Sequence, residues 1–246
     1  MTGANALKGL ASALFGIALW LSIKYLFDIP DRYLPGLEAI GRAATDIGLA
    51  WPRHIAATLS RVLIGFALGV SLGVAMALAL FRIRTLDWAM PLVHGLRAVP
   101  AVAIVPFFLL WFGFSETGRY LLVVVGLGFN VLVACADRLL APREVDTMLF
   151  LNLQEPIHRR VVAYWLPRVL EDLLPTLRFG VALALGVIVV SEMLGAQSGL
   201  GYLMQTARAT FSLNVIFLAA LILGIIATLL DWLLRVIWKS LITWRR

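Results

Sequence analysis

The amino-acid sequence predicts an all-α membrane protein with about six transmembrane helices. Of its 246 residues, 61% are hydrophobic and only 14% are charged, and the mean hydropathy of +0.93 lies far above that of an ordinary soluble domain. Several apolar runs reach the roughly 20 residues that a helix needs to cross a bilayer. The alternating pattern of barrel strands is absent, so each run is expected to close its backbone hydrogen bonds as a helix.

The net charge of +7 and the isoelectric point near 10.2 have a membrane explanation. In a soluble protein such a charge suggests a nucleic-acid partner, but positive residues also collect on the cytoplasmic face of membrane proteins. We therefore expect membrane lipid and no nucleic acid among the partners. The single cysteine, Cys135, lies in an apolar run, which excludes an internal disulfide and indicates a small buried side chain.

Six spans are predicted from the apolar runs, with ends defined to within a few residues. They are Leu10–Phe27, Ile55–Phe81, Pro91–Phe112, Arg119–Ala136, Thr176–Ala196 and Leu213–Trp238. The first run follows Lys8 and resembles a signal peptide. It is long for a signal core and no small-residue cleavage site follows, so we expect an uncleaved span.

A short interfacial helix is predicted between the first two spans. Leu37–Leu49 carries apolar residues at helical spacing among Glu38, Arg42 and Asp46, a pattern typical of a helix that lies on the membrane surface. We therefore divide the chain in two. Residues 1–54 hold the first span and this periplasmic helix, and residues 55–246 hold five further spans with a polar cytoplasmic loop at 137–175.

Basic residues in the short loops predict that both termini face the cytoplasm. With the N-terminus inside, the cytoplasmic set is more than twice as large as the outer set. The cytoplasmic set is Lys8, Arg82, Arg84, Arg138, Arg143, Arg159, Arg160, Arg168, Arg178, Arg235, Lys239, Arg245 and Arg246, and the outer set is Lys24, Arg32, Arg42, Arg53, Arg119 and Arg208. Arg61 and Arg97 fall within spans and are left out of both sets.

Glycines and prolines mark particular faces of two spans. Gly65, Gly69 and Gly73 recur at a spacing of four, which favours close helix packing over a role in a pore. Pro100 and Pro106 interrupt the third span and free backbone carbonyls that must face protein or a water-filled cavity. The third span is therefore either a kinked helix that lines a pathway or a bent structural helix.

Arg97 and Glu192 are the charges at membrane depth that point most to function, because an unpaired charge there is costly and usually faces a cavity or a partner. Arg97 either attracts an anion through its guanidinium or extends to the cytoplasmic headgroups. Glu192 either belongs to the pathway or is a helix-end residue that is solvated or paired with Arg208, and we favour the second interpretation. Arg97, Pro100 and Glu192 are thus the candidate pathway or gate residues.

No group of side chains in the sequence predicts enzyme chemistry. His54, His94 and His158 are scattered without the spacing of a metal site, and no set of nucleophile and base or pair of intramembrane carboxylates stands out. A Walker-type phosphate loop is also missing. Any ATP hydrolysis must therefore belong to another subunit.

Three motifs follow one another from the second span onward. They are Thr58–Gly69; Leu96-Arg97-Ala98-Val99-Pro100 with Leu110-Trp111-Phe112-Gly113-Phe114; and Leu166-Pro167, Leu177-Arg178, Glu192-Met193-Leu194-Gly195-Ala196 and Ser198-Gly199-Leu200-Gly201-Tyr202. In this order they resemble the permease subunit of binding-protein-dependent ABC importers, and most of all the sulfonate, nitrate and taurine type. The resemblance implies a type I importer bundle in the bacterial inner membrane for a small anion of that kind.

The same resemblance implies several partners. They would be two cytoplasmic ABC ATPase subunits, a second permease subunit that is either another copy or a paralogue, and a periplasmic or lipid-anchored solute-binding protein. ATP and Mg²⁺ would bind to the ATPase, and this chain would need no cofactor. It would not be an enzyme but would form an alternating-access pathway.

In this family the polar cytoplasmic loop holds a coupling helix that docks on the ATPase. The candidate ATPase-coupling residues are Met148, Leu149, Phe150, Leu151, Leu153, Gln154 and Glu155. Met148, Phe150 and Gln154 stand where the family has a glutamate, a small residue and a glycine. Because so apolar a segment needs a partner surface, either the ATPase groove has changed with it or this chain is the divergent half of a heterodimer. An alternative function is a permease-like scaffold or regulatory subunit that has lost transport coupling.

Overall fold

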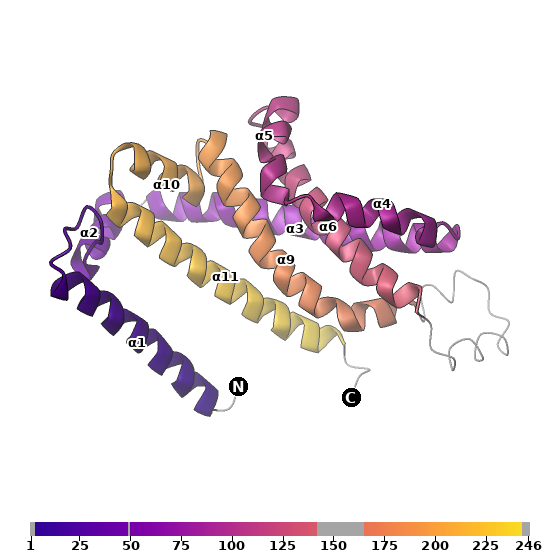
Figure 1. Ribbon diagram of the computed structural model, residues 1–246, viewed down its shortest axis with the longest axis horizontal. Coiled ribbons are helices and arrows are strands. Elements are labelled where there is room, and N and C mark those ends of the chain that lie inside the picture. The colour runs from indigo at the N-terminus through magenta and orange to yellow at the C-terminus, as the bar shows by residue number, and fades with distance from the viewer. Residues whose placement is uncertain (1–2, 49, 142–164, 243–246) are drawn as a thin grey trace.

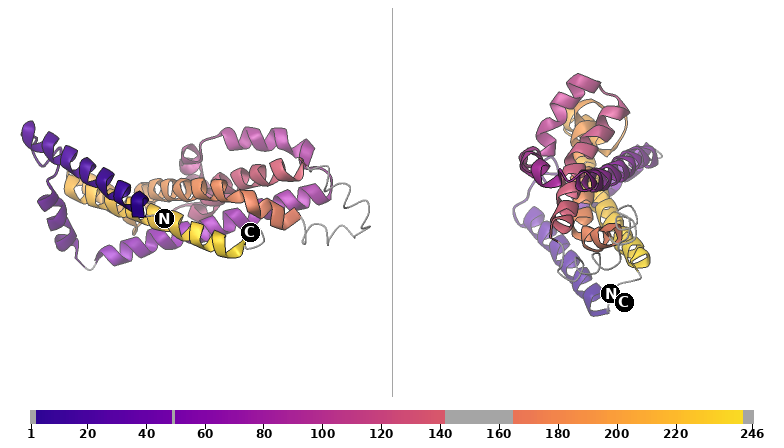
Figure 2. Two further views of the ribbon diagram at one scale, coloured as in Figure 1. Left: turned by 90° about the horizontal axis from the view of Figure 1, so that it is seen from below. Right: turned by 90° about the vertical axis from the view of Figure 1, so that its right-hand side faces the viewer.

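The computed structural model describes residues 3–48, 50–141 and 165–242, and within these ranges every regular element is a helix (Figure 1). The helices are α1 (Gly3–Leu26), α2 (Leu37–Ile47), α3 (Ala50–Arg82), α4 (Leu86–Ala98), α5 (Ala101–Phe112), α6 (Glu116–Leu139), α9 (Leu166–Gly195), α10 (Leu200–Ala209) and α11 (Leu213–Leu241). The predicted all-α class is confirmed. The bundle is elongated in one direction, as two further views show (Figure 2).

Five stretches of these helices are long and apolar enough to cross a membrane: Leu7–Leu26, Ala50–Arg82, Glu116–Leu139, Asp172–Gly195 and Leu213–Ser240. The pair α4 and α5 makes a sixth when it is counted as one bent span. α4 begins just after α3 ends, whereas α6 begins beside the opposite end of the bundle, where Arg119 contacts the Gly195 carbonyl. The pair therefore covers one crossing, and all six predicted spans have a counterpart.

The predicted third span, Pro91–Phe112, is two helices and not one. α4 ends at Ala98, the chain turns through 88°, and α5 stands across the long axis of the bundle (Figure 1). Pro100 is the cause, because a proline disfavours helical backbone at the residue before it, and Val99 is extended with φ −72° and ψ 121°. Pro106 lies inside α5, so the interruption expected there is wrong.

The helices around the cytoplasmic loop extend further than predicted. α6 continues to Leu139 and α9 begins at Leu166, because a proline is tolerated in the first turn of a helix and Pro167 occupies that turn. Both ends of the predicted loop at 137–175 are therefore helical. The coupling residues Met148, Leu149, Phe150, Leu151, Leu153, Gln154 and Glu155, as well as His158, lie outside the described residues.

The glycine face of α3 packs against α6 in the centre of the bundle. A Cβ on Gly65 would lie 2.8 Å from the Val123 Cβ, and one on Gly73 would lie 2.7 Å from the Gly128 carbonyl oxygen. Only glycine lets the two backbones approach this closely. The packing interpretation of these glycines is confirmed, and the contact places the middle of α3 directly against α6.

The two terminal spans lie at the rim. Only 6% of the apolar stretch of α1 is buried, against 44% for α6 and α9, which suits a helix surrounded largely by lipid. α1 contacts α11 through the rings of Trp20 and Phe217 at 4.8 Å. The predicted short helix at Leu37–Leu49 is present as α2, which buries Ile40 and Ala43 and exposes its charged side.

Candidate functional site

Charged side chains gather where the ends of α3, α6, α9 and α10 meet, on the side predicted to face outward. We call this set the outer network. Its members are Thr58, Arg61, Glu116, Arg119, Glu192 and Ser198. Arg61 is 6% exposed, Arg119 3% and Glu192 1%, so these three side chains are nearly closed to solvent, whereas Glu116 lies at the exposed edge of the network. Its two guanidinium groups and two carboxylates balance in charge, which buried ions require.

Arg61 is the centre of the outer network. Its Nε and NH2 groups donate to the two oxygens of Glu116, both at 2.7 Å, in the forked geometry that arginine forms with a carboxylate. Its NH1 group donates to Glu192 Oε1 and to the Ser198 carbonyl, again at 2.7 Å, and NH2 also reaches Ser198 Oγ at 3.2 Å. Every N–H group of this side chain therefore has an acceptor.

Glu192 caps the first turn of α10. Its Oε2 accepts from the Gly201 backbone N–H at 3.0 Å and from the Thr58 hydroxyl at 2.9 Å, while the Thr58 oxygen accepts from the Leu200 N–H at 2.8 Å. A helix N-terminus has unpaired N–H groups and favours negative charge. Glu192 supplies both the acceptor and the charge from within the protein.

The glycines before α10 make this approach sterically possible. Gly199 has φ +121°, a conformation that side chains rarely adopt, and a Cβ there would collide with the Glu192 carboxylate. A Cβ on Gly201 would collide with the Val189 carbonyl oxygen. The sequence Ser-Gly-Leu-Gly thus lets the chain fold back over the end of α9.

Arg119 ties the beginning of α6 to the end of α9. It donates to Glu116 Oε1 at 2.8 Å and to the Gly195 carbonyl at 3.0 Å. Its Nε is buried without a hydrogen-bond partner among the described atoms. The ring of Phe114, in the turn before α6, occupies the space where a Gly195 side chain would begin.

The favoured interpretation of Glu192 as a solvated residue or a partner of Arg208 is wrong, because its carboxylate is buried against Arg61 and Thr58. Sequence reasoning also missed Arg61 and treated Arg119 as an outer loop charge. A signal for Arg61 was available. Thr58 and Arg61 precede Gly65 at helical spacing and so lie on the close-packing face of α3, where a charge needs a buried partner.

A second polar region lies at the break between α4 and α5, where the structure brings Arg97 and Pro100 together but not Glu192. A cavity of about 190 Å³ opens there between α4, α5, α6 and α9. We call it the break cavity. It is lined by Leu96, Arg97, Val99, Pro100, Ala101, Ile104, Val125, Gly126, Phe129, Asn130, Phe179 and Leu183.

A neighbouring cavity of about 330 Å³ continues toward the side predicted to be cytoplasmic. It shares Arg97, Asn130 and Phe179 with the break cavity and adds Asp137 and Thr176. Arg97 is exposed at the boundary of the two. The two cavities together place one cation and several polar groups along a surface of the bundle that reaches from the helix break toward the cytoplasmic end.

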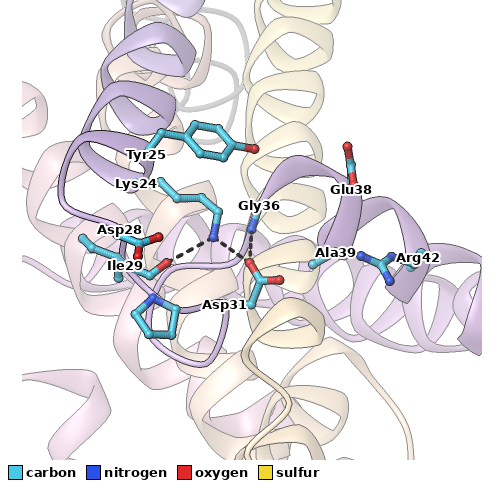
Figure 3. A pocket seen from close by; sticks show the side chains of 10 residues that line it. Lys24, Tyr25, Asp28, Ile29, Asp31, Gly36, Glu38, Ala39 and Arg42 are labelled. Carbon is cyan, nitrogen blue, oxygen red and sulfur yellow. Dashed lines mark hydrogen bonds and ion pairs between the residues drawn. The ribbon is translucent and has the colours of Figure 1, made fainter.

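The turn between α1 and α2 forms a third polar site (Figure 3), at the end of α1 that is predicted to face outward. The Lys24 ammonium is nearly buried and donates to Asp31 Oδ1 at 2.6 Å and to the carbonyls of Ile29 and Leu34. The hydrogen bond from Lys24, followed by one from the Gly36 N–H, lowers the pKa of the Asp31 carboxyl below its ordinary value. These contacts fix the turn and leave a cavity of about 330 Å³ beside it.

Among the described residues, no group of three or more histidine, cysteine or acidic side chains is placed to hold a metal ion. His54 accepts a hydrogen bond from the Gly199 N–H at 3.1 Å and stacks on Tyr202, while His94 is exposed on α4.

Comparison with known proteins agrees with this arrangement. Residues 69–242 match the family described as binding-protein-dependent transport system inner membrane component. A putative aliphatic sulfonates transport permease protein, SsuC, of Bacillus subtilis is 31% identical, with 97% of this chain and 88% of that protein covered.

Two further relatives are permease proteins. The taurine transport system permease protein TauC of Escherichia coli is 29% identical over 93% of this chain and 86% of its own length. The formylaminopyrimidine transport permease protein ThiX of Halalkalibacterium halodurans is 29% identical over 78% of each chain. With six spans, a buried outer network and this match over most of its length, the chain belongs to the family of inner membrane components of binding-protein-dependent transport systems.

Proposed function

We propose that this chain forms the membrane pathway of an ATP-driven importer for a small anionic solute, such as a sulfonate, taurine or nitrate. A binding protein would deliver the solute from outside, and a second permease subunit would complete the pathway. Two ATPase subunits with bound ATP and Mg²⁺ would drive the change between outward-open and inward-open states. This chain would contribute shape, gating and docking, and no bond chemistry.

The observation that carries the proposal is the break cavity with Arg97 at its edge. In a membrane, non-helical backbone is tolerated only where it is buried in protein or lines a water-filled cavity, and the extended Val99–Pro100 segment lines the break cavity. Discontinuous helices of this kind form the solute sites of many transporters. The break therefore supports a pathway along the face formed by α4, α5, α6 and α9.

Arg97 supports an anion as the solute. A charged side chain within a span usually faces a cavity or a partner, and Arg97 is exposed where the two cavities meet. Its planar guanidinium can bind two oxygens of a sulfonate or nitrate at once. Two of the relatives are named for aliphatic sulfonates and taurine, which supports the same class of solute.

The test is uptake of taurine, an alkanesulfonate and nitrate by vesicles that contain the reconstituted assembly. We expect Arg97→Gln to lower ATP-dependent anion uptake about tenfold or more, since a hydrogen bond to a charged group contributes about 1.5–3 kcal/mol. Arg82→Gln is the matched control, because Arg82 is exposed at the end of α3 and lines neither cavity.

Equal uptake by the two variants would refute the role of Arg97. If the wild-type assembly shows neither solute uptake nor stimulation of its ATPase by the binding protein, the chain is a scaffold or regulatory subunit instead. The two results are independent, since a transporter can lack an anion site at Arg97 and still move solute.

A further inference from the structure

Arg61 connects two parts of the molecule that are far apart in the sequence. One is the turn between α5 and α6, residues 112–116, which ends the broken span. The other is the joint between α9 and α10, residues 192–201, which includes the last turn of α9. Arg61 holds Glu116 of the first and Glu192 and Ser198 of the second with hydrogen bonds of 2.7 Å.

We propose that Arg61 is a positioning residue that fastens the α5–α6 turn to the α9–α10 joint, so that α10 stays closed on the outer ends of α3 and α9 throughout the transport cycle. This inference rests on the proposed transport function. It assigns Arg61 no contact with the solute. Its role is to keep the outer end of the broken span in place while the Val99–Pro100 break takes up movement.

Burial explains why this connection stays closed. If the turn and the joint separated, Arg61 could keep only one of its two carboxylates. If it stayed with Glu116, Glu192 would be left as an uncompensated buried charge, which is strongly unfavourable. If it stayed with Glu192, the almost fully buried Arg61 would lose both acceptors that Glu116 provides. The hydrogen bond from Arg119 to the Gly195 carbonyl would be lost at the same time.

Two other contacts also join the beginning of α6 and the turn before it to the end of α9. Arg119 donates to the Gly195 carbonyl, and the ring of Phe114 lies against Gly195. By contrast, the backbone at Val99 and Pro100 is extended and lies outside any helix. Few helical hydrogen bonds resist rotation there, so the break is the point where the broken span can bend.

To test the proposal, an engineered disulfide can take the place of the hydrogen bonds through which Arg61 joins the α5–α6 turn to the α9–α10 joint. A Cβ on Gly195 would lie 3.0 Å from the Phe114 Cγ, which is the position that a cysteine Sγ takes at residue 114. This separation suits a disulfide with an S–S bond of about 2.05 Å. Cys135 is the chain's single cysteine, and Cys135→Ala removes it from the experiment. We call Phe114→Cys with Gly195→Cys the outer staple.

In the otherwise unchanged assembly, we expect oxidation of the outer staple to leave solute uptake within about twofold of the reduced form, since no motion that limits turnover crosses it. Arg61→Lys keeps the charge but cannot form the fork with Glu116, and we expect about tenfold lower uptake from it. Oxidising the outer staple in the Arg61→Lys variant should return uptake to within about threefold of wild type, and a reducing agent should reverse this.

Two results would overturn the proposal. If oxidation blocks uptake in the assembly with Arg61 intact, the outer network opens during the cycle. If oxidation restores nothing in Arg61→Lys, Arg61 does not act by holding the turn to the joint. Glu116→Ala removes the partner of Arg61 in the α5–α6 turn and should behave like Arg61→Lys. Because Glu116 is half-exposed, this second variant separates loss of the connection from a folding defect.

A readout that does not need transport separates this inference from the proposed function. Leu200 at the start of α10 is fully buried. We expect Leu200→Cys to resist a water-soluble thiol reagent added from outside, and to react at least about tenfold faster when combined with Arg61→Lys. Equal reactivity in both would contradict the positioning role even if no solute were transported.

Discussion

The individual residues of the outer network show how a membrane protein stabilises charge away from water. Glu192 receives a guanidinium N–H, a hydroxyl and a backbone N–H, three donors from two other helices, α3 and α10. A carboxylate with this many donors is replaceable only at high cost, because each donor loses its acceptor with it. Glu116 differs, since 47% of its side-chain surface stays exposed and water can solvate it.

This contrast gives a stability prediction. Glu192→Ala should lower the free energy of unfolding by about 3–5 kcal/mol, the cost of removing one partner from a buried ion pair. Glu116→Ala, the matched control in the same network, should cost about 1 kcal/mol because its pairing is partly solvated. Thermal unfolding of the detergent-solubilised protein measures both, and equal effects would contradict the ranking of the two carboxylates.

Single residues were the hardest part to predict from the sequence. Glu192 was recognised as important, but its partner Arg61 stands 131 positions earlier in the chain. Hydropathy carries no information on such pairing. Arg97 and Pro100 are three positions apart on a local break, and the sequence therefore placed them together correctly.

At the scale of helices, hydropathy identified each span but not where its helix ends. Apolar content marks the part of a helix that meets lipid, whereas the helix itself continues while its backbone hydrogen bonds are made. α9 therefore begins ten residues before the predicted Thr176. The 88° turn at Pro100 was also beyond prediction, because a proline sets the place of a break but tertiary packing sets its angle.

The contact between α3 and α6 gives a prediction for one pair of helices. Gly73→Ala should destabilise the protein by about 1–3 kcal/mol, because the added methyl group meets the Gly128 carbonyl and Val131 and overpacks the interface. Gly224→Ala in α11 is the control, since nothing lies within 4 Å of its Cβ position. Alanine has the higher helix propensity, so this second variant should be neutral or up to about 1 kcal/mol more stable. The same thermal unfolding assay decides, and a stabilising Gly73→Ala would contradict the packing of α3 on α6.

Across the whole molecule, the two ends of the bundle are held together differently. The outer network is buried except at Glu116 and is shared by four helices. At the other end, Arg138 pairs with Asp172 between α6 and α9, Arg178 pairs with Asp231 between α9 and α11, and Asp231 also pairs with Arg235 within α11, all partly exposed. Partly exposed pairs contribute little and exchange readily with water. The described ion pairs therefore hold the end predicted to be cytoplasmic more weakly, and it is the end where an ATPase would act.

The last prediction concerns that end and the orientation of the chain together. Phe150 is expected in the coupling segment, where an apolar surface on a cytoplasmic loop needs a partner. Phe150→Asp should abolish co-purification of the ATPase subunits, because a charge buried in an apolar interface is strongly unfavourable.

Phe211→Asp is the matched control. Phe211 is 88% exposed between α10 and α11, at φ 54°, a conformation that aspartate tolerates, and it lies on the predicted outer side. This control should retain the ATPase. Retention by both variants would show that residues 148–155 do not dock the ATPase, and loss only in Phe211→Asp would show that the bundle is inserted the other way round.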